Sequence, residues 1–277
     1  MTFRLTKHHG LGNDFLVHLT DDAGAFGDRA AWVERGVRWC HRRHGIGADG
    51  LLVGLHGPAA DGVDLVMLLV NADGSIAEMS GNGIRCFAQA EALRRNQERG
   101  TFTILTDGGL RTVEYAATNT PARHQGTIEA SVGMGPAVTG PSPDRPSEAV
   151  AGERKRATFD LGNPHLVLLV DDPAAIDLAA AGAEQESAFD GGMNVHFVAP
   201  TPGEDDAMTM RVWERGAGVT EACGTGATAV ARAAHDWGLV GERVTVHMPG
   251  GDVQVAVGDP MVLRGPSVFI AGIVVTS

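Results

Sequence analysis

Lysine is nearly absent from this chain of 277 residues, which contains only Lys7 and Lys155. A pyridoxal-phosphate enzyme needs a lysine in its active site to form the Schiff base with its cofactor. Lys7 falls in the first strand-like run and Lys155 lies in a basic cluster, so neither suits that role. The sequence therefore predicts that any amino-acid chemistry of the chain proceeds without a cofactor.

Cysteine, positive charge and long apolar runs are also scarce. The three cysteines, Cys40, Cys86 and Cys223, are too few and too far apart for a disulfide framework and are expected to be thiols. A formal net charge of −12 argues against partners such as nucleic acid or an anionic membrane. The longest apolar runs, 65–70 and 166–170, suit buried strands and cannot span a membrane. Because the first residues lack an apolar signal core, a cytoplasmic location is expected.

What the chain has instead is glycine, 38 residues of it, and many short strand-like runs. Few of these runs are separated by a helical pattern, which favours a mostly antiparallel α+β fold over a doubly wound parallel sheet. Helices are expected at 28–44, closed by Gly45, at 83–96 and at 224–237. The polar stretch 116–125 is the expected boundary between two halves. The proline-rich stretch 135–156 is expected to be a surface loop of the second half.

One pattern occurs twice, as SGNGIRCFAQA at 80–90 and CGTGATAVARA at 223–233. In each copy a Gly-rich turn opens an alanine-rich helix, whose first N–H groups and dipole favour an anion. Two such helix ends facing one cavity would hold one anion from two sides. A side chain before each could then act on the two faces of a single carbon. The matched pairs are Ser80 with Cys223, Gly81 with Gly224, and Gly83 with Gly226.

Two other patterns are weaker indications of function. Residues 224–229 fit the dinucleotide pattern G-x-G-x-x-A, but no strand leads straight into them and no parallel βαβ unit surrounds them, which disfavours nucleotide binding. Residues 40–44 contain a cysteine and two histidines at a helix end crowded with arginines. Basic residues there match the helix dipole, so a solvated helix end is expected and no metal site is predicted.

Polar segments near the repeats, at 12–15, 43–50, 71–75, 162–165, 193–196 and 213–218, would each alone be ordinary turns. Together and in this order, the segments and the repeat resemble diaminopimelate epimerase, the cofactor-independent enzyme that interconverts L,L- and meso-diaminopimelate. The resemblance runs from Gly12 to the last strand. It implies two similar α+β domains, each a curled, mostly antiparallel sheet around a central helix, with the active site in the cleft between them.

Further expectations follow from the resemblance. The N-terminal domain would hold residues 1–122 and 266–277, because the last strand of this family returns to the first domain, and the C-terminal domain would hold 123–265. The partners would be a small-molecule substrate, diaminopimelate, and a second copy of the chain in a homodimer. The pathway would be that of lysine and cell-wall precursors.

The resemblance also implies a mechanism and a set of site residues. Inverting a Cα needs one group to remove its proton and another, on the opposite face, to deliver one. Thiols suit this task because their pKa, about 8.5, falls at a helix N-terminus. The implied roles are backbone donors to the substrate carboxylate (Gly81, Asn82, Gly224, Thr225), contact with the reacting amino group (Asn13, Glu214), recognition of the distal groups (Asn71, Asn163, Asn194, Arg215) and tuning of the thiols (His165, Glu214). Gly50 stands where many relatives have a glutamine that holds the substrate through its main chain, which glycine can also do.

The sequence departs from the family at its first catalytic position, where Ser80 stands in place of cysteine. Cys86 does not replace the thiol, because it lies nearly two turns into the helix and is expected in the core. Three explanations stay open: an engineered change, a natural enzyme that uses serine or a water held by it, or a relative with an altered reaction. The alternatives to the epimerase are therefore a racemase of another amino acid and a weakly active amino-acid-binding protein.

Overall fold

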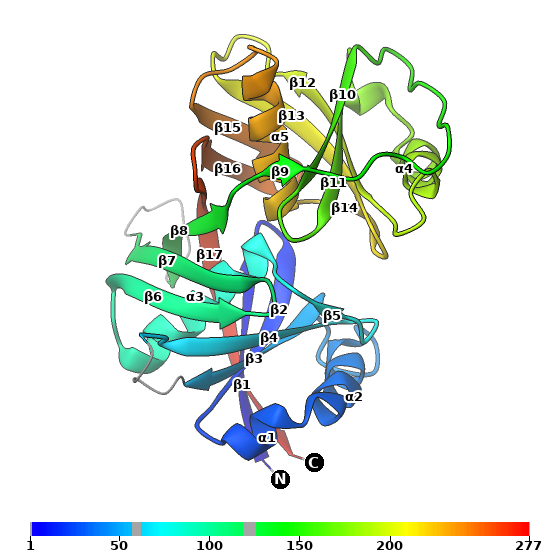
Figure 1. The fold of residues 1–277 in the computed structure, drawn as a ribbon. Helices are drawn as coiled ribbons and strands as arrows, with labels where there is room; N and C mark the ends of the chain where they lie inside the picture. Colours follow the sequence, from blue (N-terminus) through cyan, green and yellow to red (C-terminus); the bar gives the residue numbers. More distant parts are fainter. Residues whose placement is uncertain (1, 57–61, 119–125, 277) are drawn as a thin grey trace. The chain divides into compact units, whose positions relative to one another are not determined.

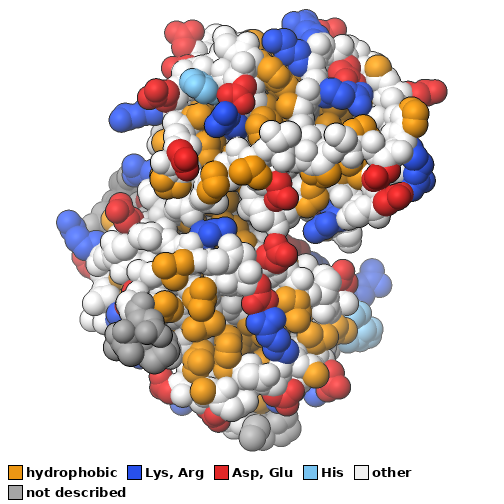
Figure 2. All heavy atoms as spheres, viewed as in Figure 1, with side chains coloured by type: hydrophobic (Ala, Val, Ile, Leu, Met, Phe, Trp, Pro, Cys, Tyr) orange, Lys and Arg blue, Asp and Glu red, His pale blue; other side chains and the backbone are white. Residues whose placement is uncertain are grey.

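The computed structural model describes residues 2–56, 62–118 and 126–276. The chain forms two compact units, the first from residues 1–132 and 265–277 and the second from residues 133–264 (Figure 1). The described part contains no helix long and apolar enough to cross a membrane. On the face drawn in Figure 2, acidic and basic side chains are interspersed over both units, without one broad area of either sign.

The sheet of the first unit closes on itself. Its ladders run in the order β17–β1–β2–β3–β4–β6–β7–β8, and β8 pairs in turn with β17. The β2–β3 and β4–β6 ladders are parallel, whereas β17–β1, β1–β2, β3–β4, β6–β7 and β7–β8 are antiparallel. The strands are β1 (Thr2–Gly10), β2 (Asn13–Thr20), β3 (Gly50–His56), β4 (Leu65–Asn71), β5 (Ile76–Ala77), β6 (Arg99–Thr106), β7 (Gly109–Ala117), β8 (Thr127–Gly135) and β17 (Met261–Thr276).

Helix α3 (Gly81–Arg95) lies inside this closed sheet, and every residue from Gly81 to Ala92 is buried. Small residues let the strands approach it, and the helix ends where Asn96 adopts the left-handed conformation that closes many helices. Helices α1 (Ala23–Gly27) and α2 (Arg29–Cys40) lie outside the sheet. Trp32 and Trp39 of α2 pack with Leu51 and Val70 of the strands in one apolar cluster.

The second unit repeats the plan. Its ladders run β9–β10–β11–β12–β13–β15–β16–β17, with β11–β12 and β13–β15 parallel and the others antiparallel. Helix α5 (Gly224–Asp236) is its buried central helix and packs against β10 to β13, β15 and β16. The other elements are β9 (Val138–Thr139), β10 (Lys155–Asp160), β11 (Pro164–Leu169), β12 (Asn194–Pro200), β13 (Ala207–Glu214), β14 (Gly218–Thr220), β15 (Arg243–Met248), β16 (Gly251–Ala256), α4 (Leu178–Ser187) and a 3₁₀ turn (Pro173–Ala175). The predicted α+β fold, a curled and mostly antiparallel sheet around a central helix in each half, is confirmed.

Several local expectations were wrong. The helix expected at 28–44 ends at Cys40, because His41 is extended and Gly45 turns back so tightly that a Cβ there would lie 2.2 Å from the carbonyl oxygen of Arg38. Helix α4 and strands β7 and β10 were missed. Part of the expected boundary, residues 119–125, lies outside the described residues.

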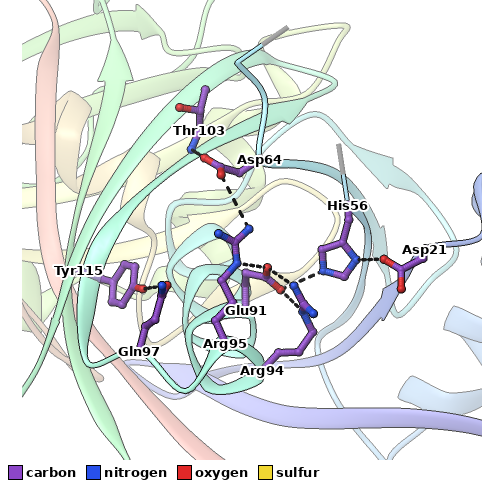
Figure 3. Close-up of polar contacts among 9 residues, drawn as sticks. All are labelled: Asp21, His56, Asp64, Glu91, Arg94, Arg95, Gln97, Thr103 and Tyr115. Carbon is purple, nitrogen blue, oxygen red and sulfur yellow. Dashed lines mark hydrogen bonds and ion pairs between the residues drawn. The ribbon is translucent and has the colours of Figure 1, made fainter. Parts of the chain in front are cut away.

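A buried carboxylate anchors the C-terminal end of α3 (Figure 3). Glu91 is fully buried and accepts hydrogen bonds from Arg94, Arg95 and His56. Burial opposes ionisation, but the bonds from Arg94, Arg95 and His56 outweigh it and lower the pKa of Glu91 to about 2. Glu91 is therefore an ion held inside the unit, far along the helix from Ser80.

Candidate active site

Ser80 begins α3 as a helix cap. Its backbone is extended, and its Oγ accepts a hydrogen bond from the N–H of Gly83 at 3.0 Å. This bond satisfies one of the helix's orphan donors, as a serine at this position normally does. Ser80 itself is half-buried. The hydroxyl of Ser80 is therefore used by the helix as well as being at the position expected for catalysis.

Beside this cap, Asn13 of β2 and Asn82 of α3 are joined. The amide nitrogen of Asn82 donates to Oδ1 of Asn13 at 3.3 Å, and Oδ1 of Asn82 accepts from the buried guanidinium of Arg85 at 2.8 Å. Arg85 also donates to the carbonyl oxygen of Gly81 at 2.8 Å. A buried cation therefore lies within the first turns of α3, next to the N–H groups expected to face an anion.

A charged cluster that sequence reasoning missed fixes the other end of Asn13. The Nδ2 of Asn13 and the backbone N–H of Asp14 both donate to Oδ2 of Asp49, at 2.9 Å each. Arg42 bonds to both Asp14 and Asp49, and Lys7 pairs with Asp14. Burial raises the pKa of Asp14, but Arg42 and Lys7 outweigh it and lower that pKa. These residues lie in or beside two of the polar segments, but only the parallel pairing of β2 with β3 shows that they meet.

Two further predicted residues lie on β3 and β4, the next strands of the sheet after β2. Gly50 pairs with Phe15 on one side and with Asn71 on the other. The Nδ2 of Asn71 donates to the hydroxyl of Ser75 at 3.0 Å, and its backbone N–H donates to the carbonyl oxygen of Ser75. A Cβ on Gly50 would lie 3.0 Å from the carbonyl oxygen of Val70, so a close backbone approach accounts for glycine at this position.

Cys223 begins α5 as Ser80 begins α3, but its side chain does not cap the helix. Its backbone is extended, its Sγ makes no capping hydrogen bond, and the residue is only 4% exposed. Burial, and then the charge of Glu214, raise the pKa of the Cys223 thiol well above its usual range. The hydroxyl of Thr225 and the N–H of Gly226 act in the opposite sense. The Sγ lies 3.6 Å from Oγ1 of Thr225.

Glu214 is the last residue of β13 and acts on Cys223, and Arg215 follows it in the chain. Trp213 pairs with Val195, which puts Glu214 one residue further along, beside Asn194. The carboxylate of Glu214 accepts from the hydroxyl of Thr220 at 2.5 Å. The backbone N–H of Arg215 donates to Oδ1 of Asn194 at 3.1 Å.

The guanidinium of Arg215 is exposed. It donates to the carbonyl oxygen of Gly191 at 3.1 Å and has no carboxylate partner among the described residues. Gly192 is needed beside it, because a Cβ there would lie 2.6 Å from Cδ of Arg215. A cation whose side chain is held in place without a counter-ion is suited to bind a carboxylate.

His165 is buried in the same group. Its Nε2 lies 2.9 Å from Oδ1 of Asn163, and its Nδ1 lies 2.9 Å from Nε2 of His196, which is also buried. Burial lowers the pKa of His165 well below its usual value and that of His196 to about 3, so both rings are neutral. Asn163 in turn donates to Oγ1 of Thr225 at 3.4 Å. Sequence reasoning quoted the segment that contains His196 but gave that residue no role.

Most of the predicted residues lie at the N-termini of the two central helices. At α3 are Asn13, Ser80, Gly81 and Asn82, and at α5 are Asn163, His165, Glu214, Cys223, Gly224 and Thr225. Gly50 and Asn71 are placed by the strands next to Asn13, and Asn194 and Arg215 bond to each other beside Glu214. Cys86 and Cys40 are buried, and burial raises the pKa of Cys86 to about 11 and that of Cys40 to about 12. The described residues contain no group of three or more histidine, cysteine or acidic side chains arranged to hold a metal ion.

Known proteins are similar to this chain in sequence and in fold. The chain is 37% identical over 264 residues to diaminopimelate epimerase of Nostoc punctiforme, covering 92% of each chain, and 39% identical over 284 residues to that of Corynebacterium glutamicum strain R, covering 98% of this chain and 97% of the relative. The fold matches a hydroxyproline epimerase from Agrobacterium vitis, solved with bound trans-4-hydroxy-L-proline, with a TM-score of 0.70 at 14% identity over 99% of this chain and 92% of that one. It also matches a predicted epimerase from Pseudomonas aeruginosa with a TM-score of 0.73 at 16% identity over 99% of both chains.

The family model for diaminopimelate epimerase matches residues 5–139 and 157–270. This match includes both helix N-termini and nearly all of the strands that position them. The resemblance inferred from the repeat and the polar segments is thereby confirmed. The chain belongs to the diaminopimelate epimerase family.

Proposed function

We propose that this protein is a cofactor-independent epimerase that interconverts L,L- and meso-diaminopimelate by proton transfer at Cα. Family membership supports this proposal, and one observation carries its chemistry. A buried thiol, Cys223, stands at the N-terminus of a central helix, where the charge of the Glu214 carboxylate raises its pKa and the Thr225 hydroxyl and the Gly226 N–H lower it. Such a thiol can exchange a proton with a carbon acid.

The proposal assigns roles to both helix ends. The substrate's α-carboxylate would bind the first N–H groups of α3 and α5, at Gly81 and Asn82 and at Gly224 and Thr225. The positive ends of the helix dipoles, with the Arg85 cation in α3, favour that anion and the charge that develops when Cα loses its proton. Asn13 and Glu214 would meet the reacting amino group.

The far end of the substrate would be recognised by Asn71, Asn163, Asn194 and Arg215. The absence of a carboxylate partner for the Arg215 guanidinium among the described residues supports its role in binding the distal carboxylate. Gly50 would contribute its main chain, and His165 would act with Glu214 on the proton-transfer groups. The proposal also places the protein in the cytoplasm and in lysine biosynthesis. It further includes a homodimer, and analytical ultracentrifugation tests this oligomeric state directly.

Ser80 sets the level of activity in this proposal. A serine hydroxyl is a much weaker acid than a thiol, and here its oxygen also accepts the Gly83 N–H. We expect proton exchange with solvent to differ between the two stereoisomers, because one face has a thiol and the other a hydroxyl. The capping bond of Ser80 also favours the second candidate, a weakly active amino-acid-binding protein.

Deuterium incorporation at Cα from solvent D₂O, followed by NMR with L,L- and meso-diaminopimelate separately, tests the proposal. Ser80→Cys should raise epimerisation by about 10²- to 10⁴-fold, the usual contribution of a positioned acid or base. Cys86→Ser exchanges the same two residue types in the opposite direction, further along α3. It is the matched control and should leave the rate of epimerisation unchanged. Tight binding without exchange in Ser80→Cys would support the binding protein, and exchange only with another amino acid would support the racemase.

A further inference from the structure

Two buried histidines meet on neighbouring strands of the second unit, and only one of them has a role in the proposed function. His165 of β11 and His196 of β12 have ring centroids 5.1 Å apart, with Nδ1 of His165 2.9 Å from Nε2 of His196. Both side chains are fully buried. Burying two imidazoles where apolar side chains could pack is unfavourable unless their hydrogen bonds compensate.

The hydrogen bonds around Asn163 fix the direction of this pair. The Nδ2 of Asn163 donates to Oγ1 of Thr225, which leaves Oδ1 facing Nε2 of His165. An amide oxygen can only accept, so Nε2 of His165 carries the hydrogen. Because the His165 ring is neutral, its Nδ1 is then an acceptor, and Nε2 of His196 must be the donor to it.

The donor-to-acceptor direction of these hydrogen bonds continues from Asn163 through Thr225 to the thiol of Cys223. Oγ1 of Thr225 accepts from Asn163, so its single hydroxyl hydrogen is available for the Sγ of Cys223 at 3.6 Å. The remaining nitrogen of His196, Nδ1, is buried without a hydrogen-bond partner. As an acceptor it can stay unpartnered at less cost than a buried N–H, which agrees with the assignment of hydrogens.

The ring of His196 is held by the helix that carries the thiol. A Cβ on Gly226 would lie 2.2 Å from Cε1 of His196, so this glycine of the repeat makes room for the imidazole. The ring therefore packs against α5 one residue after Thr225. A fixed ring gives the donor from Nε2 one direction.

We propose that His196 is a positioning residue that acts through His165 and Asn163 to orient the Thr225 hydroxyl as a donor to the sulfur of Cys223. The assignment rests on the proposed function only in taking Cys223 as a catalytic group. A hydroxyl that donates to sulfur favours the thiolate over the thiol. Glu214 acts against it from β13, the Gly226 N–H acts with it, and Arg215 is the charged group that acts on His165.

The test follows the ionisation of Cys223 without any substrate. The rate of iodoacetamide alkylation at Cys223, read by mass spectrometry of its peptide from pH 6 to 10.5, should fall by about 2- to 10-fold at a given pH in His196→Leu, the effect of losing one hydrogen bond. His196→Gln, whose amide nitrogen can replace Nε2, should restore the rate. Thr225→Val should show the same loss as His196→Leu.

The double variant His196→Leu with Thr225→Val distinguishes an effect through the orientation of the Thr225 hydroxyl from an effect of lost packing. If His196 acts through Thr225, then His196→Leu has no further effect in a Thr225→Val background. Additive effects of the two changes, or a His196→Gln rate equal to that of His196→Leu, would overturn the proposal. Thr228→Val, whose native hydroxyl donates to the carbonyl oxygen of Gly224, is the control and should leave the alkylation profile unchanged. Failure to epimerise diaminopimelate would refute the proposed function and leave this result standing.

Discussion

The two units share one sequence of ladders but use different chemistry at corresponding positions. Phe15 pairs with Gly50 in the first unit as His165 pairs with Asn194 in the second, and Leu52 then corresponds to His196. An apolar pair in one unit thus stands where two histidines stand in the other. A charged cluster at Asp14 and Asp49 fixes Asn13, whereas neutral rings fix Asn163.

The helix caps differ in the same way. A hydroxyl oxygen is a good acceptor for an N–H, so Ser80 accepts a capping hydrogen bond from Gly83 at 3.0 Å. The sulfur of Cys223 is a larger and weaker acceptor, and the Gly226 N–H at the corresponding position lowers its pKa without forming a capping bond of normal geometry. The comparison teaches that the scaffold fixes where a reactive side chain stands. The residue type then decides how strongly that side chain takes part in the helix cap.

The largest expected effect comes from placing a serine before α5, as Ser80 stands before α3. Cys223→Ser should lower the rate of Cα proton exchange by about 10²- to 10⁴-fold, because no thiol then remains at either helix N-terminus. The measurement is deuterium incorporation, with Cys40→Ser as the control for removing a buried thiol elsewhere. A rate within twofold of the parent would mean that Cys223 is not a proton-transfer group.

The next effect concerns the C-terminal parts of the helices, where α3 has the buried carboxylate of Glu91 and α5 has the exposed pair Arg232 and Asp236. Glu91→Gln should lower the free energy of unfolding by on the order of 3 kcal/mol at pH 7, since the fully buried side chain loses the negative charge that Arg94, Arg95 and His56 stabilise with hydrogen bonds. Asp236→Asn should cost at most about 1 kcal/mol. Urea denaturation measures both.

The same experiment has a defined pH dependence. The folded pKa of Glu91 is lowered to about 2 from 4.5, so its contribution to stability is present above pH 4.5 and is lost as the pH falls towards 2. The stability difference between parent and Glu91→Gln should therefore shrink over that window. A difference that stays constant from pH 7 to pH 3 would contradict the low pKa.

The smallest effect distinguishes Gly83 from Gly226, which occupy matched positions in the two copies of the repeat. Gly226→Ala should destabilise the protein by about 1–3 kcal/mol, because the new Cβ would lie 2.2 Å from the ring of His196. A Cβ on Gly83 would have its nearest neighbours in Ser80 and Phe15, at 3.1 Å or more, and Gly83→Ala gains helix propensity of up to about 1 kcal/mol. It should change stability little. Equal losses in urea denaturation would mean that the ring of His196 does not pack against the helix.

The sequence by itself determined the repeated helix openings, the α+β class and the family. These depend on signals that lie a few positions apart, such as the residues at 80–83 and 223–226 that start α3 and α5. The sequence did not predict where α2 ends, and it did not predict α4. The available signal for α4 was Asp177 as a helix cap before an alanine-rich run.

Only the tertiary structure decided which side chains meet at each helix end. Asn13 meets Asn82 across 69 positions of the chain, and His165 meets His196 across 31. Such contacts depend on which strands pair and in which register, and a shift of one residue in a strand would turn every side chain to the other face. For that reason the sequence could point to the polar segments, while the contacts of Asp49 and His196 are visible only in the folded sheets.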